Sequence, residues 1–90
     1  MPWEQSGALS VGDLVAIFTK DAETVVGEVL ATDALGIRLS TFDWRRVNYG
    51  PWEPVESCSD AILPWTAVSS IRVAKPERRQ DFLKQYAPSD

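Results

Sequence analysis

Apolar residues gather in five short runs along the chain, and each run has about the length of a β-strand. The runs cover residues 13–19, 24–31, 35–41, 59–65 and 67–73. Polar or proline-containing turns separate the runs, which is typical of antiparallel strands joined in sequence order. Both faces of the first run are apolar, and this pattern predicts a strand that is covered on both sides.

Gly27 lies inside the second run, where a glycine permits a sharp bend or a close approach of another backbone. Small barrels need such bends in order to close. A chain of 90 residues has the size of one domain, so we expect a single domain over residues 1–90. The whole pattern predicts a mainly β fold, a small and strongly bent five-stranded barrel over about residues 11–74.

The C-terminal part of the chain predicts one short helix, over about residues 76–86. Pro76 and Glu77 suit the first turn of a helix. Phe82 and Tyr86 are four residues apart, so they share one helix face. A helix of this length is marginally stable alone in water, and we therefore expect it to dock on the barrel.

Residues 42–58 are less regular, because one glycine and two prolines interrupt them. The segment is either a long loop or an extension of the third strand that turns back. It combines aromatic residues with arginines, as surfaces that bind nucleic acids or peptides do. The residues concerned are Trp44, Arg45, Arg46, Tyr49 and Trp52, of which the first three are nucleic-acid-binding candidates. In a second interpretation, the tryptophans anchor the loop and the arginines pair with Asp43, Glu53 or Glu56.

The net charge of -4 at pH 7 and the pI of about 4.7 argue against a broad basic surface for nucleic acid. The charge is uneven, since residues 1–37 carry one basic and six acidic residues, whereas residues 38–90 carry eight and seven. A second basic group consists of Arg72, Lys75, Arg78, Arg79 and Lys84. We interpret this group as mostly a solvated helix face, or as one rim of an assembly.

Catalysis is not expected, and we predict no catalytic, metal-binding or cofactor-binding residues. The chain has no histidine, which is the usual acid–base group at neutral pH. Cys58 therefore lacks a histidine that could activate it, and no His/Cys cluster has metal-ligand spacing. The acidic pairs in the loops, Asp21 with Glu23 and Glu53 with Glu56, are interpreted as solvated charge.

A cytoplasmic location without membrane association is the expectation. No stretch approaches the roughly 20 apolar residues that span a bilayer. The first ten residues contain Glu4 and no basic region, unlike a secretion signal. A single cysteine excludes an intrachain disulfide and fits a reducing compartment.

Two stretches of the chain resemble the motifs of the Sm/LSm family, whose members are Sm-like, SH3-like small barrels. VVGEVLATDALGIRL, residues 25–39, resembles the first Sm motif, with Gly27 at the bend of a strand and Asp33 in the next turn. LPWTAVSSI, residues 63–71, resembles the second motif, in which an aliphatic segment turns sharply into another strand. The spacing from Asp33 to Leu39 is closer to the bacterial RNA chaperone Hfq than to the eukaryotic Sm pattern.

The resemblance implies a homo-oligomeric ring of five to seven subunits, in which strand four of one subunit pairs with strand five of the next. Both strands are open edges, and ring closure removes them. The implied subunit interface contains Ile62, Leu63, Val68, Ile71 and Val73. In the alternative interpretation, these five residues form the core of a monomeric barrel.

The resemblance also implies that single-stranded RNA binds at the turns that follow strands two and four. The implied nucleic-acid-binding residues of these turns are Asp33, Ala34, Leu35, Trp65 and Thr66. Trp65 is able to stack a base, or it is a packed corner residue. The Lys-His pair of Hfq is missing near Trp65, and this favours an alternative function. In that alternative, the same barrel is a protein-interaction module or scaffold that presents its aromatic loop or helix to a partner protein.

Overall fold

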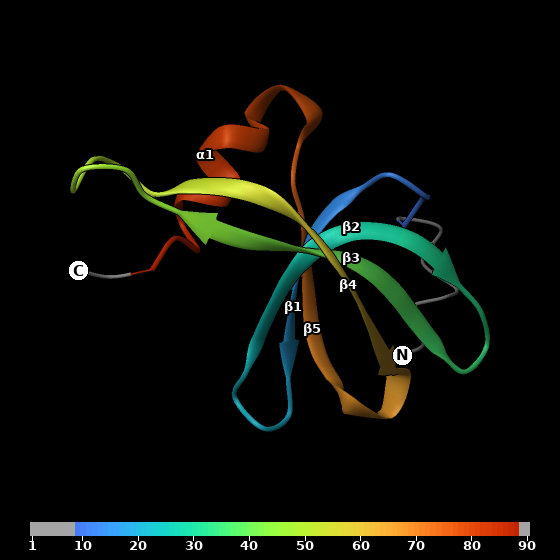
Figure 1. The fold of residues 1–90 in the computed structure, drawn as a ribbon. Coiled ribbons are helices and arrows are strands. Elements are labelled where there is room, and N and C mark those ends of the chain that lie inside the picture. Colours follow the sequence, from blue (N-terminus) through green and yellow to red (C-terminus); the bar gives the residue numbers. More distant parts are fainter. Residues whose placement is uncertain (1–8, 89–90) are drawn as a thin grey trace.

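Five antiparallel strands form one strongly twisted sheet in the computed structural model, which describes residues 9–88 apart from the side chains of residues 56–58 (Figure 1). The strands are β1 (Leu14–Thr19), β2 (Thr24–Thr32), β3 (Gly36–Arg45), β4 (Glu53–Pro64) and β5 (Val68–Val73). Their order across the sheet is β4-β3-β2-β1-β5. The mainly β fold is therefore confirmed, while residues 1–8 and 89–90 of the predicted domain lie outside the described residues.

Short helices complete the described part of the chain: η2 (Trp65–Ala67) and η3 (Pro76–Arg78) are 3-10 helices, and α1 (Arg79–Lys84) is an α-helix. The η2 turn connects β4 to β5 and confirms the predicted sharp turn. The predicted C-terminal helix forms, but only six residues of it are α-helical. Its N-cap, Arg78, has φ -123° and ψ 27° and offers no side-chain cap, so the segment begins as a 3-10 turn.

The prediction of a closed barrel is wrong. Strands β4 and β5 form the two edges of the sheet and do not pair with each other. The three-residue η2 turn instead leads β5 to β1, where the N–H of Lys20 donates to the carbonyl oxygen of Ala67 at 3.0 Å. One side of β5 is thus occupied by β1, and within this chain its other side has no strand partner among the described residues.

Strand β1 is buried on both faces, as its two apolar faces predict. Its four residues from Leu14 to Ile17 are at most 1% exposed. The inner cluster, inside the bend of the sheet, consists of Val15, Ile17, Val29, Ile37, Leu39 and Val68. The outer cluster, on the opposite face, consists of Leu14, Ala16, Phe82 and Leu83. Strand β1 therefore contributes to both small cores, one within the bent sheet and one between the sheet and α1.

The segment 42–58 extends β3 and turns back, which was one of its two interpretations. Strand β3 continues to Arg45 and β4 begins at Glu53, so the connecting loop is short. A shift in the β3–β4 register lies between Ser40 and Phe42. Beyond this shift, residues 42–56 form an arm that extends away from the rest of the sheet, beside α1 (Figure 1).

Gly27 provides the predicted close approach of two backbones. A Cβ atom at this position would lie 2.5 Å from the carbonyl oxygen of Ser40 and 3.2 Å from Cβ of Leu39, both in β3. Gly27→Ala is therefore expected to lower the free energy of unfolding by about 1–3 kcal/mol, measured by equilibrium urea unfolding. The control Thr24→Ala, an exposed change in the same strand, should stay within about 0.5 kcal/mol of wild type. A Gly27→Ala chain as stable as wild type would contradict the close approach.

Candidate functional site

The two turns that resemble the RNA-binding turns of the Sm family lie side by side. Oδ1 of Asp33 accepts hydrogen bonds from the backbone N–H groups of Leu35 at 2.8 Å and Gly36 at 3.0 Å. This aspartate turn gives the β2–β3 loop a defined conformation. Nε1–H of Trp65 then donates to the carbonyl oxygen of Asp33 at 2.6 Å, and its backbone N–H donates to Leu35 O at 3.0 Å. Residues 33–36 and 65–66 thus form one turn cluster.

The most exposed large hydrophobic side chain of the turn cluster is aliphatic and not aromatic. Trp65 is partly buried and packs against the inner cluster, so it is the packed corner residue of the alternative interpretation. Ala34 and Thr66 are exposed, and the aliphatic side chain of Leu35 is 82% exposed. An aliphatic side chain stacks a base less well than an aromatic ring.

A groove of about 430 Å³ runs from the turn cluster along β3 and β4. Its lining includes Leu35 and Ile62, and Arg38 is the one cation among its described residues. Nη2 of Arg38 lies 2.6 Å from Oδ2 of Asp60, so this charge is paired with a carboxylate. Asp33 adds a further acidic group to the lining. The groove therefore has no excess positive charge with which to hold phosphates.

The arm carries the second set of candidate residues. The guanidinium carbon of Arg46 lies 4.8 Å from the ring centroid of Trp52 and 5.5 Å from that of Tyr49, which are cation–π distances. Nη2 of Arg45 lies 3.8 Å from Oε2 of Glu53. Both side chains are about two-thirds exposed, so this ion pair contributes little to stability. Trp44 packs against the outer cluster. Trp44 is therefore an anchor, whereas Arg46 organises the aromatic rings of the arm.

The tip of the arm has an unusual backbone conformation that the sequence analysis missed. Asn48 and Tyr49 both have positive φ angles, 51° and 59°. Asparagine tolerates this left-handed region, whereas a tyrosine adopts it at a cost in backbone strain. Tyr49 is also 91% exposed. Asn48 and the following Gly50 are turn-forming residues, but they do not reveal that the intervening tyrosine takes the strained position.

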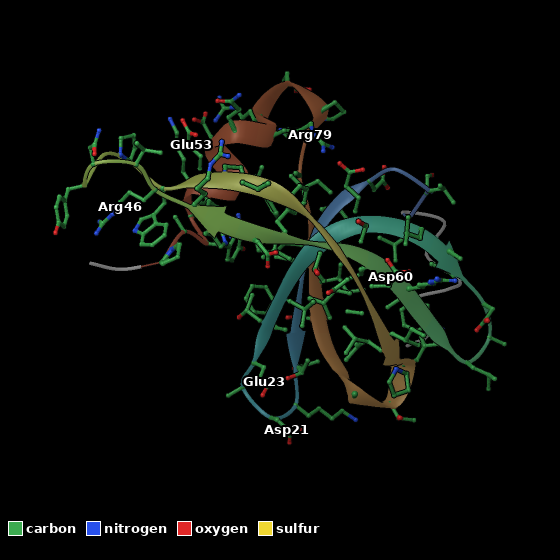
Figure 2. All side chains as sticks on the ribbon, viewed as in Figure 1. Asp21, Glu23, Arg46, Glu53, Asp60 and Arg79 are labelled. Atoms are coloured by element: carbon green, nitrogen blue, oxygen red, sulfur yellow. The ribbon has the colours of Figure 1, made fainter. Side chains whose placement is uncertain are left out.

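The two sets of candidate residues do not form one site. The turn cluster lies at one end of β3, and the tip of the arm lies beyond its other end. Strand β3 is ten residues long. At about 3.3 Å per strand residue, the separation is on the order of 30 Å. Figure 2 shows Arg46 out on the arm, well away from Asp60 on the other half of β4. The nucleic-acid-binding candidates of the sequence therefore lie on two separate surfaces of the fold.

The five candidate interface residues differ in burial. Val68 belongs to the inner cluster and is 5% exposed, so its side chain already packs within one chain. Leu63 and Ile71 are partly buried against the same cluster. Ile62 on β4 is 74% exposed and Val73 on β5 is 41% exposed. Of the five, Ile62 and Val73 are thus exposed enough on the edge strands to contact another molecule.

The acidic residues of the described part of the chain do not gather into a metal site. Within this part of the chain, no set of three or more His, Cys, Asp or Glu residues is placed to hold a metal ion. Asp21 and Glu23 lie exposed at the β1–β2 turn (Figure 2). No described helix is both long enough and apolar enough to cross a membrane.

Comparison of the chain with models of protein families, with curated proteins and with solved structures gives no match. The resemblance to the Sm/LSm family therefore rests on the two sequence stretches, residues 25–39 and 63–71. What the chain does has to be argued from its own strand edges, charges and aromatic rings.

Asp33→Ala removes the acceptor of two backbone hydrogen bonds in the turn cluster. Each such bond contributes about 0.5–1.5 kcal/mol, so the free energy of unfolding should fall by about 1–3 kcal/mol. Urea unfolding followed by tryptophan fluorescence measures this loss. Asp33→Asn retains an acceptor oxygen in the same place and should recover most of the stability. If Asp33→Ala unfolds at the wild-type urea concentration, this side chain does not hold the turn.

Proposed function

We propose that this chain is an Sm-like module that assembles with copies of itself into a ring, and that the ring binds single-stranded RNA. The observation that carries the proposal is the open sheet, whose order leaves β4 and β5 as free edges. These are the two strands that the Sm family pairs between subunits. A free edge presents unpaired N–H and C=O groups, and pairing β4 with β5 of the next copy would satisfy them.

The side chains on the two edges suit this pairing. Ala61 and Leu63 of β4 lie opposite the buried residues Leu39 and Ile37 of β3, which places them on the inner face of the sheet. Val73 of β5 lies opposite Val15 and is on the same inner face. A β4–β5 junction between copies would continue the inner cluster across the interface and would cover the exposed part of Val73.

The ring predicts a discrete mass of five to seven chains of 10.0 kDa, about 50–70 kDa, in size-exclusion chromatography with light scattering. Val73→Lys places a charge on the free edge and is expected to give a monomer with an unchanged far-UV circular dichroism spectrum. Leu30→Lys is the matched control, because Leu30 is 40% exposed on the central strand β2. It should leave the mass unchanged. A wild-type chain that elutes as a monomer at every concentration would exclude the ring.

The arm supports RNA binding better than the turn cluster does. It combines a guanidinium group with two aromatic rings, and the ring of Tyr49 is 91% exposed. Stacking of bases on aromatic side chains tolerates any sequence, since every base has a π-face. A ring of copies would repeat the arm in each subunit and so multiply a weak contact.

Tyr49→Ala in the assembled protein is expected to weaken binding of a labelled homopolymeric oligoribonucleotide about tenfold, because one stacked base contributes about 1–3 kcal/mol. Fluorescence anisotropy at low salt measures the affinity, which should fall as the salt concentration rises. The control Val47→Ala removes a 64% exposed aliphatic side chain from the same arm and should change the affinity less than about twofold. Absence of binding to every homopolymer at low salt would exclude the RNA part of the proposal.

A protein-interaction module is the second candidate function, and the tip of the arm favours it. Tyrosine, tryptophan and arginine are the residue types enriched where protein interfaces gain most of their affinity. The arm carries all three, with the guanidinium group of Arg46 beside both rings, and Tyr49 is held there in a strained, exposed conformation. Loss of a defined partner protein on Tyr49→Ala, in a chain that binds no homopolymer, would establish this function in place of RNA binding.

A further inference from the structure

The second basic group of the sequence is divided by the fold. Nη2 of Arg79 lies 2.6 Å from Oε1 of Glu28, an ion pair that joins α1 to β2. Lys84 lines a groove between α1 and the arm. The three remaining cations line one separate groove of about 400 Å³ at the end of β5; they are Arg72, Lys75 and Arg78.

Arg72 is positioned in this groove by uncharged partners. Its Nη1 donates to Oε1 of Gln85 at 3.1 Å and to the hydroxyl of Tyr86 at 2.9 Å. Its guanidinium carbon lies 5.6 Å from the ring centroid of Phe82. These contacts fix the orientation of the guanidinium group without neutralising its charge. They use only Nη1, so Nε–H and Nη2 remain able to donate to a ligand.

The groove carries a net positive charge in a chain whose net charge is -4. Lys75 and Arg78 are exposed, and neither forms an ion pair with a residue in the described part of the chain. Among the described residues of the lining, Asp81 is the one acidic residue. Three cations against one carboxylate leave an excess of two positive charges.

We propose that this groove binds a dianionic phosphate group. A phosphate monoester carries a charge of about -1.5 to -2 at pH 7, which matches the excess in the groove. A planar guanidinium group of fixed orientation donates two parallel hydrogen bonds to phosphate oxygens, and the flexible Lys75 supplies a point charge beside it. A ligand with a single carboxylate group would neutralise only half of the excess positive charge.

The source of the phosphate is either a free phosphate compound or the terminal phosphate of a nucleic-acid strand. The groove also has apolar lining from Val73 and Ala74, and its volume of about 400 Å³ leaves room for the group that carries the phosphate. The site is separate from the turn cluster and the arm and does not depend on RNA binding at the arm, although it shares Val73 with the proposed β4–β5 junction.

Inorganic phosphate, titrated into ¹⁵N-labelled protein at low salt, is the first probe. The Nε–Hε signal of Arg72 is expected to shift in a saturable manner, because Arg72 lines the groove and its hydrogen bonds within the protein use Nη1. Lys75→Gln combined with Arg78→Gln should weaken binding at least about tenfold, since it removes two of the three cations. Lys20→Gln combined with Lys84→Gln is the matched control. It changes the net charge equally but spares the groove, and should weaken binding less than about twofold.

Asp81→Asn tests the charge balance in the opposite direction. Removal of the one carboxylate from the lining is expected to tighten phosphate binding about threefold, because it removes a repulsion. A purely structural role for the groove would not produce tighter binding. Absence of a saturable shift in the wild-type protein, or equal weakening by the two double variants, would overturn the proposal.

Oligoribonucleotides with a 5′-phosphate and with a 5′-hydroxyl distinguish the two sources. A strand end is the source if the 5′-phosphate tightens binding and the Lys75→Gln, Arg78→Gln variant abolishes this advantage. A free phosphate compound is the source if inorganic phosphate binds and the two oligoribonucleotides bind equally. In both cases the experiment remains informative when Tyr49→Ala has no effect on RNA, because the readout is the groove and not the arm.

Discussion

The burial of β1 on both faces is the constraint on which the rest of this small fold depends. A chain of 90 residues buries a modest fraction of its surface, so one strand serves two cores. On the inner side, the other strands bend around Val15 and Ile17. On the outer side, α1 covers Leu14 and Ala16, although six α-helical residues would not persist without this contact. Loss of the packing on either the inner or the outer face would expose apolar atoms of β1 to water.

The arm and the basic groove at the end of β5 are both built on the outer cluster. Trp44 packs against it and anchors the base of the arm, which positions Arg46 and the tip beyond it. Tyr86 packs against the same cluster and also accepts the hydrogen bond from Arg72 that orients the phosphate groove. The short helix α1 is therefore a support for two surfaces on its different sides, rather than a binding element in its own right.

The arginines of the fold differ in whether a carboxylate of the protein neutralises their charge. Arg38 and Arg79 each lie 2.6 Å from a carboxylate, and both pairs join neighbouring elements of the fold. Arg72 instead contacts only uncharged groups in the described part of the chain, so its charge stays available to a ligand. The free edges of β4 and β5 are the corresponding feature of the backbone, because no second strand pairs with either of them among residues 9–88. The acidic net charge therefore coexists with a local basic groove and with two edge strands that lack a second strand partner in the described part of the chain.

The sequence by itself determined the positions of β1, β2 and β5, the two-sided burial of β1 and the close approach at Gly27. These features follow from the period of apolar residues and from one missing side chain, which are local properties. Only the tertiary structure decided that the sheet stays open, that residues 42–56 form an arm, and that the helix is short. It also decided that Arg79 pairs with Glu28, 51 positions away, while Arg72 contacts uncharged groups. Such outcomes depend on which strands pair and which distant side chains meet, and the local pattern around each residue does not contain that information.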